Sequence, residues 1–174
     1  PLKLQLLSEV VDEIDENIGK RAPIAVWCSR TRELLAAGLV CAGVPAEEAQ
    51  EAGTIGAAND ERYRECLVRA RNGRVGIIHG RTQTRERDHI QADWKAGLIR
   101  TVVAHPGVAG AGLNWQHVEA TVYFSQPLGT IARQQSEDRV HRHGLKHTAL
   151  YYALVMEEGA ALAVALAHAR QANA

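Results

Sequence analysis

Five short apolar runs, separated by helical patterns, constrain the fold of this chain most. The runs are continuous rather than alternating, which is typical of strands buried on both faces of a parallel sheet. We expect strands at Ile24–Ser29, Val75–Gly80, Thr101–His105, Ala120–Ser125 and Thr148–Val155. Helical patterns follow the first, second and fourth runs, at Thr31–Ala42, Thr84–Ala96 and Ile131–His143. Strands that alternate with helices predict an α/β fold, a parallel sheet flanked by helices.

Three segments lie outside this alternation. An acidic amphipathic helix is expected at residues 1–18 and an alanine-rich helix at Glu157–Ala172. The segment Val44–Arg74 is longer than a usual connection between a helix and a strand, and it contains a charged helical pattern. The length of 174 residues therefore predicts a single domain, residues 1–174, with a helical insertion at 44–74.

Composition narrows the class of protein. Apolar residues make up 46% of the chain, which is enough for a core and excludes a disordered chain. No apolar run approaches the roughly 20 residues that span a bilayer, so we expect no membrane partner. Cys28, Cys41 and Cys66 form an odd set without C-x-x-C spacing. We therefore expect the three cysteines to be reduced thiols and the protein to be cytoplasmic.

Charge is unevenly spread along a chain whose formal net charge is zero. Residues 1–61 carry 5 basic and 11 acidic side chains, residues 62–100 carry 10 basic and 4 acidic ones, and the remainder carries 5 of each. The middle region is therefore a candidate for contact with a polyanion, although a solvated charged surface explains it equally well. His141, His143 and His147 lack a second ligand cluster, so no metal site is expected.

The segment QSEDRVHRHG, residues 135–144, carries the most specific chemistry. It places Arg139 and Arg142 three residues apart, so in a helix both point to one face. Arginine has a permanent charge and a planar fork of donors that matches phosphate oxygens. Two such forks suit a triphosphate whose charge must be stabilised during transfer. The alternative is a solvated amphipathic helix with incidental arginines.

Glycines and polar residues follow two of the expected strands. The third strand runs into AHPGVAGAGLN, whose glycines let the backbone approach a ligand. The order G-x-x-G-x-G differs from the dinucleotide-binding fingerprint. His79, Arg81 and Thr82 follow the second strand, where open α/β sheets bind ligands, and Arg81 and Thr82 are candidate phosphate donors. A capping or surface role explains these residues equally well. Arg85 and Arg87 are expected to be solvated on the following helix.

Together these segments resemble superfamily-two helicases. The pattern Q-x-x-x-R-x-x-R-x-G resembles the last helicase motif, and the residues QSEDRVHRHG are similar to those of Snf-type translocases, with phage and bacterial members the nearer resemblance. AGAGLN resembles the fifth motif, and Ile24–Arg30 resembles the fourth. The motifs stand in the family's order over residues 20–156. The segment Gln126-Pro127-Leu128-Gly129 departs from the family, whose members often have Trp-Asn-Pro there.

The resemblance implies a RecA-like C-terminal lobe of a DNA-dependent ATPase. Arg139 and Arg142 would act as arginine fingers, with Gln135 orienting the nucleotide. The loop that couples nucleotide and nucleic acid would contain Gly110, Gly112, Leu113 and Asn114. Ser29 and Arg30 would face nucleic acid with His79, Arg81 and Thr82. The implied cofactor is ATP with Mg²⁺, and the implied partners are an N-terminal RecA-like lobe of the same protein and double-stranded DNA.

The sequence contains no G-x-x-x-x-G-K-[ST] phosphate loop and no Asp-Glu pair after an apolar strand. We therefore expect the isolated chain to be inactive as an ATPase. The sequence begins at Pro1 and its single methionine is Met156, so we expect a fragment or processed form. The resemblance implies a bacterial or phage-infected host cell. Two alternatives stay open: a non-catalytic nucleic-acid-binding module, which the basic middle region favours, and a small-molecule-binding α/β domain that uses the glycine loop.

Overall fold

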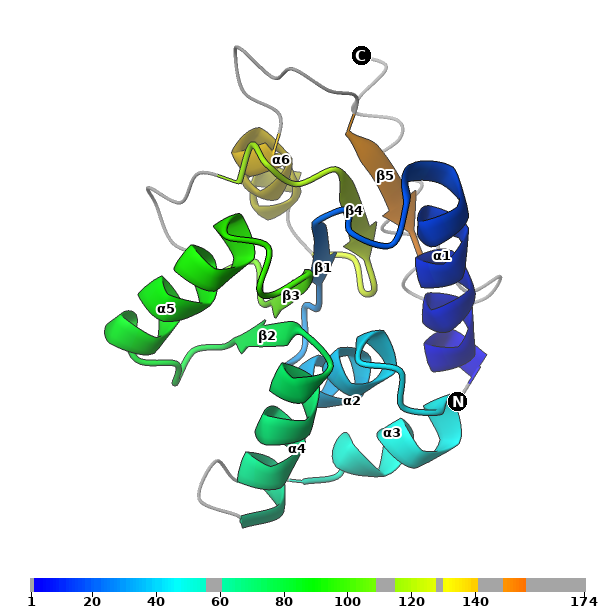
Figure 1. Ribbon diagram of the computed structural model, residues 1–174, viewed down its shortest axis with the longest axis vertical. Coiled ribbons are helices and arrows are strands. Elements are labelled where there is room, and N and C mark those ends of the chain that lie inside the picture. Colours follow the sequence, from blue (N-terminus) through cyan, green and yellow to red (C-terminus); the bar gives the residue numbers. More distant parts are fainter. Residues whose placement is uncertain (1, 56–60, 109–114, 128–129, 141–148, 156–174) are drawn as a thin grey trace.

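In the computed structural model, five parallel strands form one sheet with helices on both faces (Figure 1). The structure describes residues 2–55, 61–108, 115–127, 130–140 and 149–155. The strands are β1 (Ile24–Trp27), β2 (Val75–Ile78), β3 (Thr101–Ala104), β4 (Ala120–Tyr123) and β5 (Leu150–Ala153). They lie in the order β2-β3-β1-β4-β5, and each neighbouring pair is parallel. The predicted α/β fold and each predicted strand are thereby confirmed.

The helices divide between the two faces of the sheet. One face is covered by α1 (Leu2–Ile18), α2 (Thr31–Cys41), α3 (Ala46–Ala52) and α4 (Glu61–Asn72). The other is covered by α5 (Thr84–Lys95) and α6 (Thr130–Val140). The expected helices are confirmed within the described residues, whereas the helix expected at 157–172 lies outside them.

The central strand β1 shows why its sequence is apolar at every position. Ile24 and Val26 belong to the core under α1 and α2, while Ala25 and Trp27 belong to the core under α5 and α6. All residues of β1 to β4 are buried. The edge strand β5 differs, because its residues alternate between half-buried and exposed. The expectation of burial on both faces is therefore wrong for β5, whereas β2, at the other edge of the described sheet, is buried at every position.

Three tryptophans fill the core under α5 and α6. Trp27 stacks on Trp115 with ring centroids 4.8 Å apart, and Trp94 meets Trp115 edge to face at 5.1 Å. The indole nitrogen of Trp94 donates to the carbonyl of Arg100 at 2.9 Å. The backbone N–H of Trp115 donates to the carbonyl of Arg139 at 3.1 Å. This aromatic cluster therefore ties the end of β1 to the last turn of α6.

The segment 44–74 contains two helices rather than one. The sequence pattern did not predict helix α3. Its alanine face packs against α1 and α2 and consists of Ala46, Ala49 and Ala52. An ion pair between Arg69 and Glu48 joins α4 to α3. Both partners are about half exposed, so the pair contributes little stability. The description of this segment as an insertion stays a prediction.

Candidate nucleotide and nucleic-acid interface

The candidate site lies at the carboxyl edge of the sheet, where the predicted residues that follow β1 and β2 lie. Strand β1 leads into α2 on one face, while its neighbour β4 leads toward α6 on the other. Open α/β sheets bind ligands in the crevice that forms where successive connections leave in opposite directions. Ser29 follows β1 and His79 follows β2, so the structure brings these two predicted residues to the same edge.

Ser29 is held by the loop after β4. Its backbone N–H donates to Ser125 Oγ at 2.6 Å, and its hydroxyl donates to the Ser125 carbonyl at 3.1 Å. The Ser125 hydroxyl in turn donates to Glu33 Oε2 at 2.6 Å. Glu33 lies in the first turn of α2, where a carboxylate is favoured by the helix dipole. Arg30, which follows Ser29 in the chain, is exposed.

His105, after β3, completes the link between neighbouring strand ends, and sequence reasoning missed it. Its Nδ1 accepts the Gly107 N–H at 3.1 Å, so in the neutral ring the hydrogen lies on Nε2. That Nε2–H donates to the Ser29 carbonyl at 3.1 Å. The available signal was position, because His105 is the last residue of its apolar run and His79 is the last but one of the second run.

The loop after β2 is closed by its own hydrogen bonds. The His79 N–H donates to Thr82 Oγ1 at 3.0 Å, and the Thr82 N–H returns to the His79 carbonyl at 3.0 Å. The Arg81 N–H donates to His79 Nδ1 at 3.1 Å. His79 and Thr82 are buried, whereas the Arg81 side chain is exposed. Burial lowers the pKa of His79, so its ring is neutral at pH 7.

Arg87 connects the loops after β2 and β3. It is half-buried on α5, and its guanidinium donates to the Thr82 carbonyl at 3.0 Å and to the Val108 carbonyl at 3.2 Å. The expectation of a solvated side chain is therefore wrong for Arg87, because two loop carbonyls lie within its reach. Arg85 is exposed, as expected. Val108 immediately precedes the glycine-rich segment, so Arg87 fixes the point where that segment begins.

Helix α6 carries Gln135 and Arg139 of the last motif. Arg139 lies in its last turn and is 8% exposed, with the guanidinium carbon 5.8 Å from the Trp27 ring centroid. Gln135 is exposed on the same helix. Arg142 lies outside the described residues, as do the four predicted residues of the glycine loop: Gly110, Gly112, Leu113 and Asn114.

A second arginine of α6, which the sequence motif does not include, organises the end of β4. The Arg133 guanidinium carbon lies 3.4 Å from the Tyr123 ring centroid, and Nη1 donates to Gln126 Oε1 at 2.7 Å. Tyr123 Oη and Ser136 Oγ are 2.7 Å apart. Burial raises the pKa of Tyr123 well above its usual range, so the phenol is neutral.

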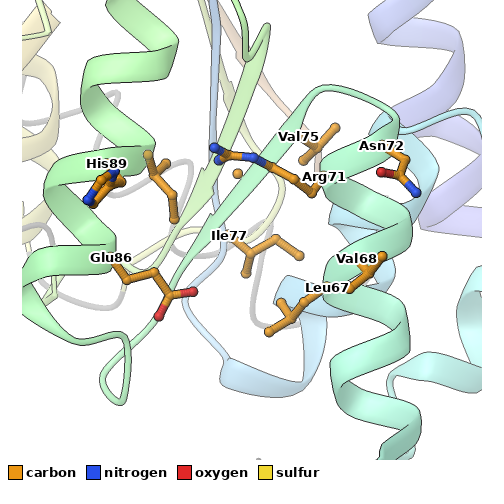
Figure 2. A pocket seen from close by; sticks show the side chains of 10 residues that line it. Leu67, Val68, Arg71, Asn72, Val75, Ile77, Glu86 and His89 are labelled. Atoms are coloured by element: carbon orange, nitrogen blue, oxygen red, sulfur yellow. The ribbon is translucent and has the colours of Figure 1, made fainter.

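A groove of about 300 Å³ runs along β2, between α4 and α5. Figure 2 shows Val75 and Ile77 at its base, with Leu67 and Val68 on one wall and Glu86 and His89 on the other. Arg71 reaches across and pairs with Asp93 of α5. None of the predicted site residues lines this groove.

Two negative findings hold for the described part of the chain. No group of three or more His, Cys, Asp and Glu side chains could hold a metal ion there. No helix among these residues is long and apolar enough to cross a membrane. The histidines at 141, 143 and 147 lie outside the described residues.

Comparison with known proteins gives the same picture of the fold. The solved C-terminal part of the Fun30 ATPase domain matches with a TM-score of 0.64 and 14% identity, over 94% of this chain and 44% of that one. The DUF1998 helicase MrfA, solved with DNA and AMPPNP, matches with a TM-score of 0.64 and 13% identity, over 99% of this chain and 20% of that one. This chain therefore spans less than half the length of either.

A search of curated protein sequences finds no significant relative. The conserved C-terminal domain of helicases matches residues 9–144, which is most of the chain. That match includes the carboxyl-edge loops and the arginine motif of α6. The chain belongs to the helicase conserved C-terminal domain family.

Proposed function

We propose that this chain is the C-terminal motor lobe of a Snf-type, DNA-dependent ATPase that translocates on double-stranded DNA. The observation that carries the proposal is the arrangement of the carboxyl edge. Loops that follow β1, β2 and β3 are joined there through His105 and Arg87, and the guanidinium carbon of Arg139 lies 5.8 Å from the ring centroid of Trp27, the last residue of β1. The family membership and the fold support the same reading.

In this proposal the loops after β1 and β2 hold backbone phosphates of DNA. Arg30 and Arg81 are exposed and supply charged donors, while Ser29 and His79 are hydrogen-bonded within the loops. Contacts of this kind position a protein on DNA without reading its sequence. The excess of basic residues at 62–100 favours the same polyanion. The MrfA structure, which contains DNA, is consistent with this assignment.

The arginine motif acts on a nucleotide held mainly by another lobe. The guanidinium of Arg139 lies over Trp27, the last residue of β1, and therefore at the carboxyl edge. In the proposal, Arg139 and Arg142 act as arginine fingers, and Gln135 orients the nucleotide. The residues of the glycine loop, 110–114, couple this site to the DNA track. Because the sequence contains no phosphate loop, ATP and Mg²⁺ are held by an N-terminal RecA-like lobe of the same protein.

The test is DNA-stimulated ATPase activity in a protein that includes this first lobe. We expect Arg139→Ala and Arg142→Ala each to lower kcat at least about 100-fold, because arginine fingers contribute roughly 10³–10⁵ in rate. Arg85→Ala is the matched control, since Arg85 is exposed on α5. Near-normal activity in both motif variants would contradict the arginine-finger assignment.

A further inference from the structure

Tyr63 of helix α4 contacts His79, the residue that follows β2. Tyr63 is half-buried, and its hydroxyl oxygen lies 2.8 Å from His79 Nε2. The two rings are edge to face, with centroids 5.8 Å apart and planes at 90°. Tyr63 belongs to the segment 44–74, which carries none of the sequence motifs. A residue from outside the motifs thus contacts the candidate phosphate-binding loop.

The loop determines the direction of this hydrogen bond. The Arg81 N–H donates to His79 Nδ1 at 3.1 Å, so Nδ1 is an acceptor. A neutral imidazole carries a single ring hydrogen, which must then lie on Nε2. Nε2–H donates to the Tyr63 oxygen, and the hydrogen of the Tyr63 hydroxyl is directed elsewhere. Tyr63 therefore keeps a donor for a group outside the loop.

The surroundings keep this donor in place. Burial, and then the charge of Glu86, raise the pKa of Tyr63, so the hydroxyl stays protonated at neutral pH. Burial lowers the pKa of His79 and keeps the ring neutral. The exposed guanidinium of Arg81 belongs to the same loop and acts electrostatically on both residues. A neutral O–H beside a guanidinium matches the donors that proteins use for backbone phosphates.

We propose that Tyr63 is a phosphate-contacting residue, whose hydroxyl donates to the nucleic-acid backbone beside the Arg81 side chain. The candidate interface then extends from the motif loops onto α4. This gives the segment 44–74 a role that no sequence motif in it indicates. The inference rests on the proposed function, because it requires nucleic acid at the carboxyl edge.

The experiment measures binding of a fluorescent DNA duplex by anisotropy over a series of salt concentrations. Tyr63→Phe should weaken binding roughly tenfold, the effect of one hydrogen bond to a charged group. It should leave the slope of log K against log salt unchanged, because a phenol displaces no counterion. Arg81→Ala should reduce that slope by about 0.9. Tyr151→Phe is the matched control, since Tyr151 is 38% exposed on β5.

The outcomes are distinguishable. Absence of DNA binding by the unchanged chain overturns the proposed function and this inference with it. If Tyr63→Phe binds DNA as tightly as Tyr151→Phe does, this inference alone is overturned. Nitrogen NMR of His79 tests whether Tyr63 contacts the phosphate or only supports the loop. A phosphate contact predicts the Nε2–H tautomer of His79 in both the wild-type and the Tyr63→Phe protein. A different tautomer in Tyr63→Phe would show that the substitution changes the loop, and would overturn the contact role. If Tyr63→Phe weakens the binding of ATP but not of DNA, the inference is overturned, and the phosphate that Tyr63 contacts belongs to a nucleotide instead.

Discussion

His79 shows how neighbouring groups set the state of one side chain. Its Nδ1 accepts from the Arg81 backbone and its Nε2 donates to Tyr63, so both ring nitrogens are used in the neutral form. Protonation would place a hydrogen on Nδ1, opposite the Arg81 N–H. The candidate loop therefore depends on a neutral imidazole.

This arrangement predicts a pH dependence of stability. The folded-state pKa of His79 is lowered from 6.5, mainly by burial, with Glu86 opposing and Arg81 assisting the shift. The unfolded chain thus binds this proton more readily. The contribution of neutral His79 to the stability of the folded state is fully present above pH 6.5 and is lost as pH falls through the lowered pKa. Between about pH 7 and pH 5, we expect the free energy of unfolding, measured with urea, to fall less in His79→Gln than in the wild type. Equal losses in the two proteins would show that His79 does not titrate in this way.

At the scale of elements, neighbouring helices add to the hydrogen bonds that the loops make among themselves. Helix α5 supplies Arg87 to the loops after β2 and β3, and α6 supplies Arg133 to Gln126 after β4. Helix α5 itself ends at Lys95, and Gly97, two residues later, has a φ of +74°, which suits glycine. The Gly97 and Leu98 N–H groups return to the carbonyls of Trp94 and Asp93, which closes the helix end.

Arg87→Ala should lower the free energy of unfolding by about 1.5–3 kcal/mol, the range for hydrogen bonds that involve a charged group. The loops should also become more open to hydrogen exchange at Thr82 and Val108. Arg85→Ala, two residues away on the same helix, should change stability by less than about 0.5 kcal/mol. Chemical denaturation of the two variants checks both values. Similar losses from both would mean that the Arg87 contacts are not stabilising.

Close packing of α5 on β2 gives a second prediction for this element. A Cβ at Gly76 would lie 2.5 Å from Ile90 Cγ2, whereas a Cβ at Gly80 would have its nearest neighbour at 3.9 Å. We expect Gly76→Ala to cost about 1–3 kcal/mol through overpacking. Gly80→Ala is the control and should be close to neutral. Thermal unfolding measures the difference, and an unaffected Gly76→Ala protein would mean that α5 moves away at little cost.

At the scale of the whole molecule, charge and topology act together. Basic residues are concentrated in the region 62–100, which includes α4, β2 and α5. Parallel strands place their carboxyl ends on one edge, so the loops after β1 and β2 lie at the same edge even though β3 separates the strands. The sheet thereby joins a charged region to the loops of the motifs.

The proposed DNA track predicts a steep dependence of binding on salt. With about three phosphate contacts, the affinity should fall about 40-fold between 50 and 200 mM salt. A peptide nucleic acid of the same sequence lacks phosphates and should not bind. Fluorescence anisotropy with both probes provides the measurement. Equal affinity for the two probes would contradict backbone recognition and would favour a different ligand for this edge.

The sequence predicted the strands well because burial on two faces requires apolar residues at every position, a local property of composition. It did not predict α3, whose seven residues carry a short pattern of alanine and glutamate. It was also wrong about Arg87, because an arginine beside other charges looks the same whether solvated or bound to carbonyls. His105 was missed because its partner, the Ser29 carbonyl, lies 76 residues away in the chain.

The amino-acid sequence by itself determined the order of strands and helices, the arginine motif and the basic middle region, because each depends on residues close together in the chain. Only the tertiary structure decided which residues meet at the carboxyl edge. Ser29 reaches Ser125 because β1 lies beside β4, and Tyr63 reaches His79 because α4 packs along β2. Such contacts follow from strand order and helix packing, which depend on the free energy of the whole core rather than on any local pattern.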